Sequence, residues 1–297
     1  MSIRSRLSSA RHAAGRARAA AHRAVERSRR TPPPYLTDSL AARNGWPVGF
    51  AHRGADVRRE NTLAAYEAAV DAGFGHLELD VQTTRDGVLV CFHDDTLDRV
   101  TTGSGRIADH TWADLAEVRT GGEPLLRFED LLRRWDDVRL NVDLKGRSST
   151  EELVRLVALH DAWDRVLFAS FDDSRRRHVR SVLRRTGHAG RRVAFSAGEK
   201  AIAALVLLGP VGLARTLKRW AVDIDCLQVP VSHKGIPVVT PGFVRRAHAA
   251  GLAVHVWVID DAAEMERLLE MGVDGIMTDR ADVLAEVFTR RGIWPQR

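Results

Sequence analysis

This sequence has few cysteines and no long hydrophobic run. Its two cysteines among 297 residues, Cys91 and Cys226, both lie within apolar runs. Two such residues do not make the disulfide framework of a small secreted domain, and they fit a reducing compartment. The longest uncharged stretch, residues 201–214, is broken by Gly209 and Pro210 and is too short to span a hydrocarbon core of about 30 Å. We therefore expect no transmembrane segment and a cytoplasmic location.

Acidic residues are nearly absent from the first thirty positions. Nine arginines and the single acid Glu26 give residues 1–30 a charge of +8, so the remaining chain carries −2 of the total of +6. The segment lacks the continuous apolar stretch of a secretory signal, and residues 31–34 (Thr-Pro-Pro-Pro) form a stiff spacer. We expect residues 1–45 to be a basic arm, flexible or weakly helical, that can contact an anionic inner membrane face. No base-reading motif predicts a specific nucleic-acid partner, and the oligomeric state stays open.

Two carboxylates spaced for one face of a strand carry the clearest chemical signal. Glu78 and Asp80 lie in His-Leu-Glu-Leu-Asp-Val, and side chains two apart in a strand share a face. His52 and His93 each end an apolar run on either side of this segment. Hard oxygen ligands and groups that can move protons near neutral pH are the parts of a metal-assisted phosphodiester hydrolase.

A tight turn returns the second histidine to the acids. Residues 84–87 (Thr-Arg-Asp-Gly) separate two apolar runs, and an Asp-Gly pair in this setting is a strong hairpin signal. Folding about this turn sets His93 and Asp94 roughly opposite Glu78 and Leu79. One hairpin therefore delivers a metal-binding face and a proton carrier to the same place.

A third segment adds an acid and a lysine two residues apart. In Arg-Leu-Asn-Val-Asp-Leu-Lys-Gly, Asp143 can supply a further metal ligand while Lys145 points at the same cavity. Three buried acids without a counter-charge would cost several kcal/mol per ion. A divalent metal is the natural positive group to place among them.

Taken together and in this order, the motifs resemble the glycerophosphodiester phosphodiesterase family. The matching strings span about residues 48 to 290 and are His52-Arg53-Gly54, Glu60-Asn61-Thr62, Glu78-Leu79-Asp80-Val81, Thr84-Arg85-Asp86-Gly87, His93-Asp94 with Leu97, Arg99, Thr101 and Thr102, Asn141 to Lys145, Ser170-Phe171-Asp172, His255-Val256-Trp257 and Asp274 to Asp279. The resemblance implies a TIM barrel with one divalent cation, Mg²⁺ or Ca²⁺. It further implies the following roles: His52 and His93 as acid and base, Glu78 and Asp80 as metal ligands, and Arg53 and Lys145 as phosphate-binding residues.

The sequence departs from the family pattern at Asp143, where the family usually has Glu. The shorter side chain reaches less far, so Asp143 would bind the metal through a water or draw it toward its own strand. Trp257 is retained as the apolar wall for the glycerol. Glu60 is expected behind Arg53 or His52, where it would orient them, and Ser170 is a weaker candidate for the same outer layer.

Apolar runs and helical patterns alternate from Val48 onward, which predicts an α/β fold. We expect a TIM (β/α)8 barrel domain over residues 46–297 with a β-hairpin and a small insertion, residues 95–127, after the second barrel strand. The expected strands are 48–51, 76–82, 139–144, 165–170, 191–195, 223–228, 253–258 and 274–278, with the hairpin return at 88–93 outside the ring. The expected helices are 62–72, 127–135, 150–160, 173–186, 199–208, 212–220, 241–250, 261–271 and 281–289. Expected N-caps are Asn61 or Thr62, Thr150, and Asp172 or Asp173.

The function predicted from these residues is metal-dependent hydrolysis of small-molecule glycerophosphodiesters to glycerol 3-phosphate and an alcohol, by acid-base catalysis with two histidines. The sequence does not decide between water and a neighbouring glycerol hydroxyl as nucleophile, nor which histidine begins as base. One alternative is a phospholipase D-type activity on lysophospholipid or sphingomyelin, which Asp143 and the basic arm favour. An alternative of another class is a noncatalytic barrel that binds a phosphoester or a membrane.

Overall fold

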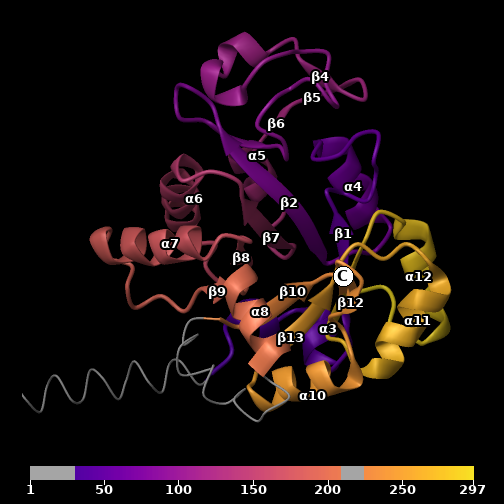
Figure 1. Ribbon diagram of the computed structural model, residues 1–297. Coiled ribbons are helices and arrows are strands. Elements are labelled where there is room, and N and C mark those ends of the chain that lie inside the picture. Colours follow the sequence, from indigo (N-terminus) through magenta and orange to yellow (C-terminus); the bar gives the residue numbers. More distant parts are fainter. Residues whose placement is uncertain (1–30, 209–223) are drawn as a thin grey trace, which may run out of the picture. The chain divides into compact units, whose positions relative to one another are not determined.

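The alternating pattern folds into a nearly closed barrel of parallel strands. The computed structural model describes residues 31–208 and 224–297. Within them, eight parallel strands pair in the order β10-β13-β14-β1-β2-β7-β8-β9, and a parallel bridge between Ser196 and Cys226 brings the two ends of the row together (Figure 1). The strands are β1 (Val48–His52), β2 (His76–Thr83), β7 (Arg139–Leu144), β8 (Val166–Ala169), β9 (Ala194–Phe195), β10 (Cys226–Val229), β13 (Ala253–Val256) and β14 (Gly275–Thr278). Each lies where the sequence predicts a strand, so the predicted barrel is confirmed.

Helices connect successive strands and lie outside them (Figure 1). They are α4 (Leu63–Asp71), α5 (Phe128–Arg134), α6 (Ser148–Leu159), α7 (Asp173–Arg185), α8 (Glu199–Leu208), α10 (Pro241–Ala249), α11 (Ala262–Met271) and α12 (Ala281–Arg290). The helix predicted at 212–220 falls outside the described residues. No described helix has both the length and the apolar character needed to cross a bilayer.

Two of the three expected N-caps are confirmed. Thr62 accepts a hydrogen bond from the backbone N–H of Ala65, and Asp172 accepts one from Ser174. The prediction for Thr150 is wrong, because α6 already begins at Ser148 and Thr150 lies inside its first turn. Arg147 already has helical backbone angles (φ −72°, ψ −37°), so the helix starts earlier than the cap pattern indicates.

The hairpin and the insertion also form as expected. Strand β3 (Leu89–Cys91) runs antiparallel to β2 with Val81 opposite Cys91, and the backbone N–H of Phe92 donates to Asp80 O at 2.9 Å. Continuing this register sets His93 opposite Leu79, as the turn predicts. The insertion contains the 3-10 helices η1 (Ile107–Asp109) and η2 (Ala113–Leu115) and the short strands β4 (Arg119–Thr120), β5 (Glu123–Pro124) and β6 (Leu126–Arg127). Its residues Leu97, Ile107, Leu115 and Leu125 pack with Val90 and Phe92 of the hairpin in a small separate core.

The described part of the N-terminal segment forms two short helices, α2 (Pro34–Thr37) and α3 (Leu40–Arg43). Tyr35 is buried and packs with barrel residues Leu167, Ala169, Ala194 and Cys226. The flexible or weakly helical arm is a prediction that falls mostly on residues 1–30, outside the described residues, and the domain boundary after residue 45 also stays a prediction. A second hairpin, formed by β11 (Ser232–His233) and β12 (Ile236–Pro237), follows β10, and unlike β2 and β3 its strands are exposed.

Candidate active site

A cavity of about 240 Å³ opens at the carboxyl ends of the barrel strands. Loops at this end of a barrel carry the active sites of such folds. Nine of the ten residues predicted for the site line the cavity: His52, Arg53, Glu78, Asp80, His93, Asp143, Lys145, Ser170 and Trp257. The tenth, Glu60, lies behind them and contacts Arg53. The structure thus brings residues from six strands and the loops that follow them to one place.

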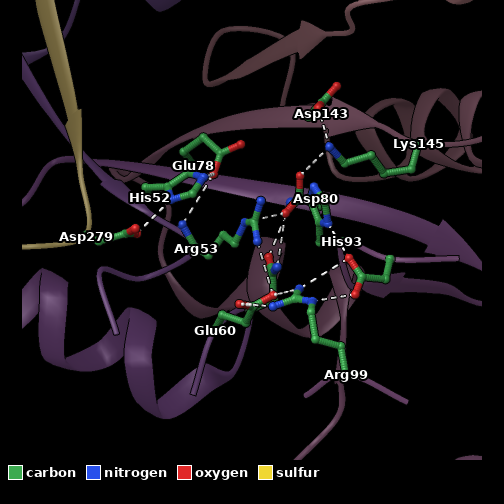
Figure 2. A network of polar contacts seen from close by, with 12 residues as sticks. His52, Arg53, Glu60, Glu78, Asp80, His93, Arg99, Asp143, Lys145 and Asp279 are labelled. Atoms are coloured by element: carbon green, nitrogen blue, oxygen red, sulfur yellow. Dashed lines mark hydrogen bonds and ion pairs between the residues drawn. The ribbon is translucent and has the colours of Figure 1, made fainter. Parts of the chain in front are cut away.

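His52 ends β1 and is held by two carboxylates. Its Nδ1 lies 2.7 Å from Asp279 Oδ1, and its Nε2 lies 3.8 Å from Glu78 Oε2 (Figure 2). Burial opposes protonation of the imidazole, but the charges of Glu78 and Asp279 outweigh it and raise the pKa of His52 above its ordinary value. Because Asp279 binds Nδ1, the other ring nitrogen is left toward the cavity.

His93 follows β3 and is held in a matching way from the opposite side of the cluster. Its Nδ1 pairs with Asp94 Oδ1, and Asp94 in turn receives hydrogen bonds from Arg99. The hydrogen bond from Arg99 is the main cause that lowers the pKa of Asp94 to about 2. Each histidine therefore has its Nδ1 fixed by an aspartate, and Nε2 of His52 makes only the 3.8 Å contact with Glu78.

Three buried acids share two cations in the floor of the cavity. Asp80 contacts Arg53 Nε at 3.0 Å and Lys145 Nζ at 2.9 Å, and Lys145 Nζ also lies 2.7 Å from Asp143 Oδ2. Burial raises the pKa of Asp80, but Lys145 and Arg53 outweigh it, so the net shift is downward. Glu78 receives less compensation: burial, together with the charge of Asp80, raises its pKa to about 7.

The acids retain unused binding capacity. Asp143 Oδ1 is buried and has no hydrogen-bond partner among the described residues, and burial raises the pKa of Asp143. No three His, Cys, Asp or Glu side chains of residues 31–208 and 224–297 stand close enough together to form a metal-binding group. Lys145 Nζ lies between Asp80 and Asp143 instead (Figure 2). The donor set is nevertheless of the hard oxygen type that Mg²⁺ and Ca²⁺ require.

The loop after β1 owes its shape to a left-handed backbone. Arg53 and Asn61 have φ angles of 50° and 60°, and a Cβ on Gly54 would come within 2.7 Å of Ala65 Cβ. Asn61 Nδ2 donates to Asp80 Oδ2 at 3.2 Å, and its Oδ1 accepts from the Asp80 backbone N–H at 3.3 Å. This fold of the His-Arg-Gly segment turns Arg53 back over the acids.

Aromatic rings form one wall of the cavity. Trp257 follows β13 and meets Phe171 edge to face, with ring centroids 5.4 Å apart and planes at 89°. The Phe171 residue is 51% exposed. Ser170, by contrast, hydrogen-bonds locally: its Oγ accepts from the Asp172 backbone N–H at 3.2 Å and donates to Leu144 O at 3.4 Å.

Three residues that have no role predicted from the sequence lie beside the histidines or behind their partners in the structure. Asp279 directly follows β14, Asp94 follows His93, and Arg99 lies in the insertion. All three belong to strings that match the family pattern. A polar residue directly after a barrel strand is a recognisable signal for Asp279, whereas no spacing rule links Arg99 to its partner Glu60, which lies 39 positions away in the sequence.

The chain is similar in sequence to a family model and to curated proteins. The model of the glycerophosphoryl diester phosphodiesterase family matches residues 52–283. A probable glycerophosphodiester phosphodiesterase 2 of Mycobacterium tuberculosis is 40% identical over 255 residues, which is 85% of this chain and 94% of the relative. A glycerophosphodiester phosphodiesterase of Caldanaerobacter subterraneus is 27% identical, with 82% of this chain and 98% of the relative covered.

Solved structures share the fold at lower identity. An Oleispira antarctica phosphodiesterase in complex with the product sn-glycerol-3-phosphate superposes with a TM-score of 0.66 at 22% identity, covering 83% of this chain and 98% of that one. A glycerophosphodiester phosphodiesterase of Agrobacterium tumefaciens gives 0.66 at 24% identity, covering 82% and 99%. At these identities the superpositions establish the barrel fold.

Proposed function

The chain belongs to the glycerophosphoryl diester phosphodiesterase family, and from this membership we propose that it hydrolyses glycerophosphodiesters to glycerol 3-phosphate and an alcohol. The observation that carries the proposal is the shared cavity: two histidines, each held at Nδ1 by an aspartate, face the same 240 Å³ space as two fixed cations. A phosphodiester needs both kinds of group, one to move protons and the other to bind its anionic oxygens.

Proton transfer falls to His52 and His93. One imidazole takes the proton of the nucleophile, which is water or the neighbouring glycerol hydroxyl, while the other gives a proton to the departing alkoxide. If the glycerol hydroxyl attacks, water must then open the cyclic phosphate in a second step with the two histidines in exchanged roles, which completes the hydrolysis. Asp279 and Asp94 fix the two rings in the tautomer that leaves Nε2 for this task. Their separate carboxylates support independent roles for the two histidines.

Phosphate binding falls to Arg53 and Lys145. Both side chains line the cavity, and the planar guanidinium suits two oxygens of one phosphate. Negative charge grows on the nonbridging oxygens as phosphorus becomes five-coordinate, so fixed cations stabilise the transition state more than the bound substrate. Trp257, backed by Phe171, offers the apolar surface for the glycerol or the alcohol.

Glu78, Asp80 and Asp143 would hold one divalent cation, Mg²⁺ or Ca²⁺. Asp143 Oδ1 has no hydrogen-bond partner among the described residues, and the pKa of Glu78 is raised. Both observations fit such an ion, because they show buried carboxylates with too little positive charge beside them. When bound, the cation would supply Lewis-acid stabilisation of the phosphate oxygens. Lys145 would then exchange its contacts with Asp80 and Asp143 for the phosphate.

The test is a screen of glycerophosphodiesters with Mg²⁺ or Ca²⁺ added, reading glycerol 3-phosphate and free alcohol separately. Release of both products, and its loss in EDTA with recovery on metal addition, is the expected result. No turnover of any glycerophosphodiester with either metal would refute the proposed function. Activity that EDTA does not change would refute the metal requirement but leave the proposed hydrolysis standing.

A phospholipase D-type reaction on lysophospholipid is the second candidate, and the exposed Phe171 beside Trp257 favours it because this edge could receive an acyl chain. Matched assays with glycerophosphocholine and lysophosphatidylcholine separate the two functions. A higher kcat/KM for the lysolipid would reverse their order.

A further inference from the structure

The Arg99 guanidinium joins two carboxylates that lie on different loops around the cavity. Its Nη1 and Nη2 donate to Glu60 Oε2 and Oε1 at 3.1 and 2.7 Å (Figure 2). Its Nε and Nη2 donate to the two oxygens of Asp94. Each carboxylate is thus held through both of its oxygens. Such two-point pairs fix orientation as well as distance.

Each of these carboxylates holds one functional side chain. Asp94 accepts from Nδ1 of His93, and Glu60 accepts from Arg53 Nη1 at 3.2 Å. The chain of contacts therefore runs from His93 through Asp94, Arg99 and Glu60 to Arg53. None of its three middle members lines the cavity, so they reach the substrate only through His93 and Arg53.

We propose that Arg99 is a positioning residue that sets the proton-transferring His93 and the phosphate-binding Arg53 in register with each other. This inference rests on the proposed function, since it assigns Arg99 to the same reaction. Without Glu60, the Arg53 guanidinium could turn further toward Asp80, which its Nε already contacts at 3.0 Å. Glu60, kept in place by Arg99, holds the other side of the guanidinium and leaves a defined face toward the cavity.

The competing explanation is that Arg99 only fastens the insertion to the barrel. The two explanations predict different changes in kcat and KM. A fastening role lowers the amount of folded enzyme, which reduces apparent kcat and leaves KM unchanged. A positioning role changes both constants, because misplacing His93 slows proton transfer while misplacing Arg53 weakens phosphate binding.

Arg99→Lys is the informative variant. Lysine keeps the charge and most of the stem, so the insertion stays attached, but an ammonium has no planar fork for two carboxylates. We expect kcat to fall and KM for glycerophosphocholine to rise, with kcat/KM down about 10- to 100-fold, the scale of a misplacement near 1 Å. Asp94→Asn should mainly lower kcat, and Glu60→Gln should mainly raise KM.

Arg85→Ala is the matched control. Arg85 also ties the insertion down, through Asp109 O at 2.8 Å and Asp114 at 3.4 Å, and it does not line the cavity. Its KM should match that of the wild type, and its apparent kcat should fall only as far as the amount of folded enzyme falls. An unchanged KM in Arg99→Lys, or equal losses in Arg99→Lys and Arg85→Ala, would overturn the inference. If the wild type itself turns over no glycerophosphodiester, the proposed function fails first and independently of Arg99.

Discussion

Replacing Glu78 by glutamine should stabilise the metal-free protein at alkaline pH. The pKa of this buried carboxyl is raised from 4.5 to about 7, by burial first and by Asp80 second. The native state therefore binds more protons than the unfolded state between these values, so the free energy of unfolding falls as pH rises through this window. Two and a half pKa units correspond to about 3 kcal/mol lost by pH 8.

The assay is urea unfolding of the wild type and Glu78→Gln in EDTA at several pH values from 5 to 8. Because all other groups are common to both proteins, the difference between them isolates Glu78, and it should grow toward higher pH in favour of glutamine. Adding Mg²⁺ or Ca²⁺ should reverse the order, since a ligand that binds only the native wild type stabilises it. Glu286→Gln, at an exposed helix position, is the control and should show no such trend. Parallel pH curves for the wild type and Glu78→Gln would refute the reasoning.

Three further outcomes are expected. His52→Ala and His93→Ala should each lose at least about 10²-fold in kcat with the fold intact by circular dichroism, and wild-type turnover in both would contradict acid-base catalysis. Trp257→Ala should raise KM by up to about 10-fold with little effect on kcat, since it removes an aromatic contact made in the ground state and transition state alike; a fall in kcat alone would argue against a binding wall. His255 is buried, and burial lowers its pKa to about 4, so the wild type should lose about 1.4 kcal/mol per pH unit between pH 6.5 and 4 as the unfolded state takes up the proton first. His255→Leu should flatten this loss in denaturant titrations, and an equal slope would contradict the assignment.

The sequence predicts the barrel and most of the site because both follow from short-range rules. Alternation with period two sets Glu78 and Asp80 on one face, and the turn at residues 84–87 fixes the register that carries His93 back to them. These rules depend on local backbone geometry, which a single sequence records. The partners of the histidines do not follow from these local rules. Asp279 lies 227 positions from His52 and meets it only because β14 pairs with β1.

The details that the sequence could not supply concern how charges are shared. Strand spacing predicts that Asp143 and Lys145 face one cavity, but not that Lys145 inserts between Asp143 and Asp80. That choice depends on the summed field of all nearby groups in a buried setting, where each unpaired charge is costly. The same limit applies to Arg99, whose two carboxylate partners come from separate loops.

The charge balance of the cavity supplies the last argument for a bound cation. Among the described residues that line it, three carboxylates face two fixed cations, Arg53 and Lys145, which leaves one formal negative charge when both histidines are neutral. A phosphodiester brings another negative charge, so the two would repel in a site of low dielectric. Protonating Glu78 could remove one charge, but its pKa of about 7 makes that incomplete at neutral pH. A divalent ion held by the carboxylates would raise the balance from −1 to +1 with both histidines neutral, or from 0 to +2 with the proton-donating histidine protonated, and it would favour the anionic substrate in either state. Affinity for an uncleavable phosphodiester should therefore rise with added Mg²⁺ or Ca²⁺ in the wild type and not in Asp80→Asn; equal affinity with and without metal would show that Arg53 and Lys145 suffice.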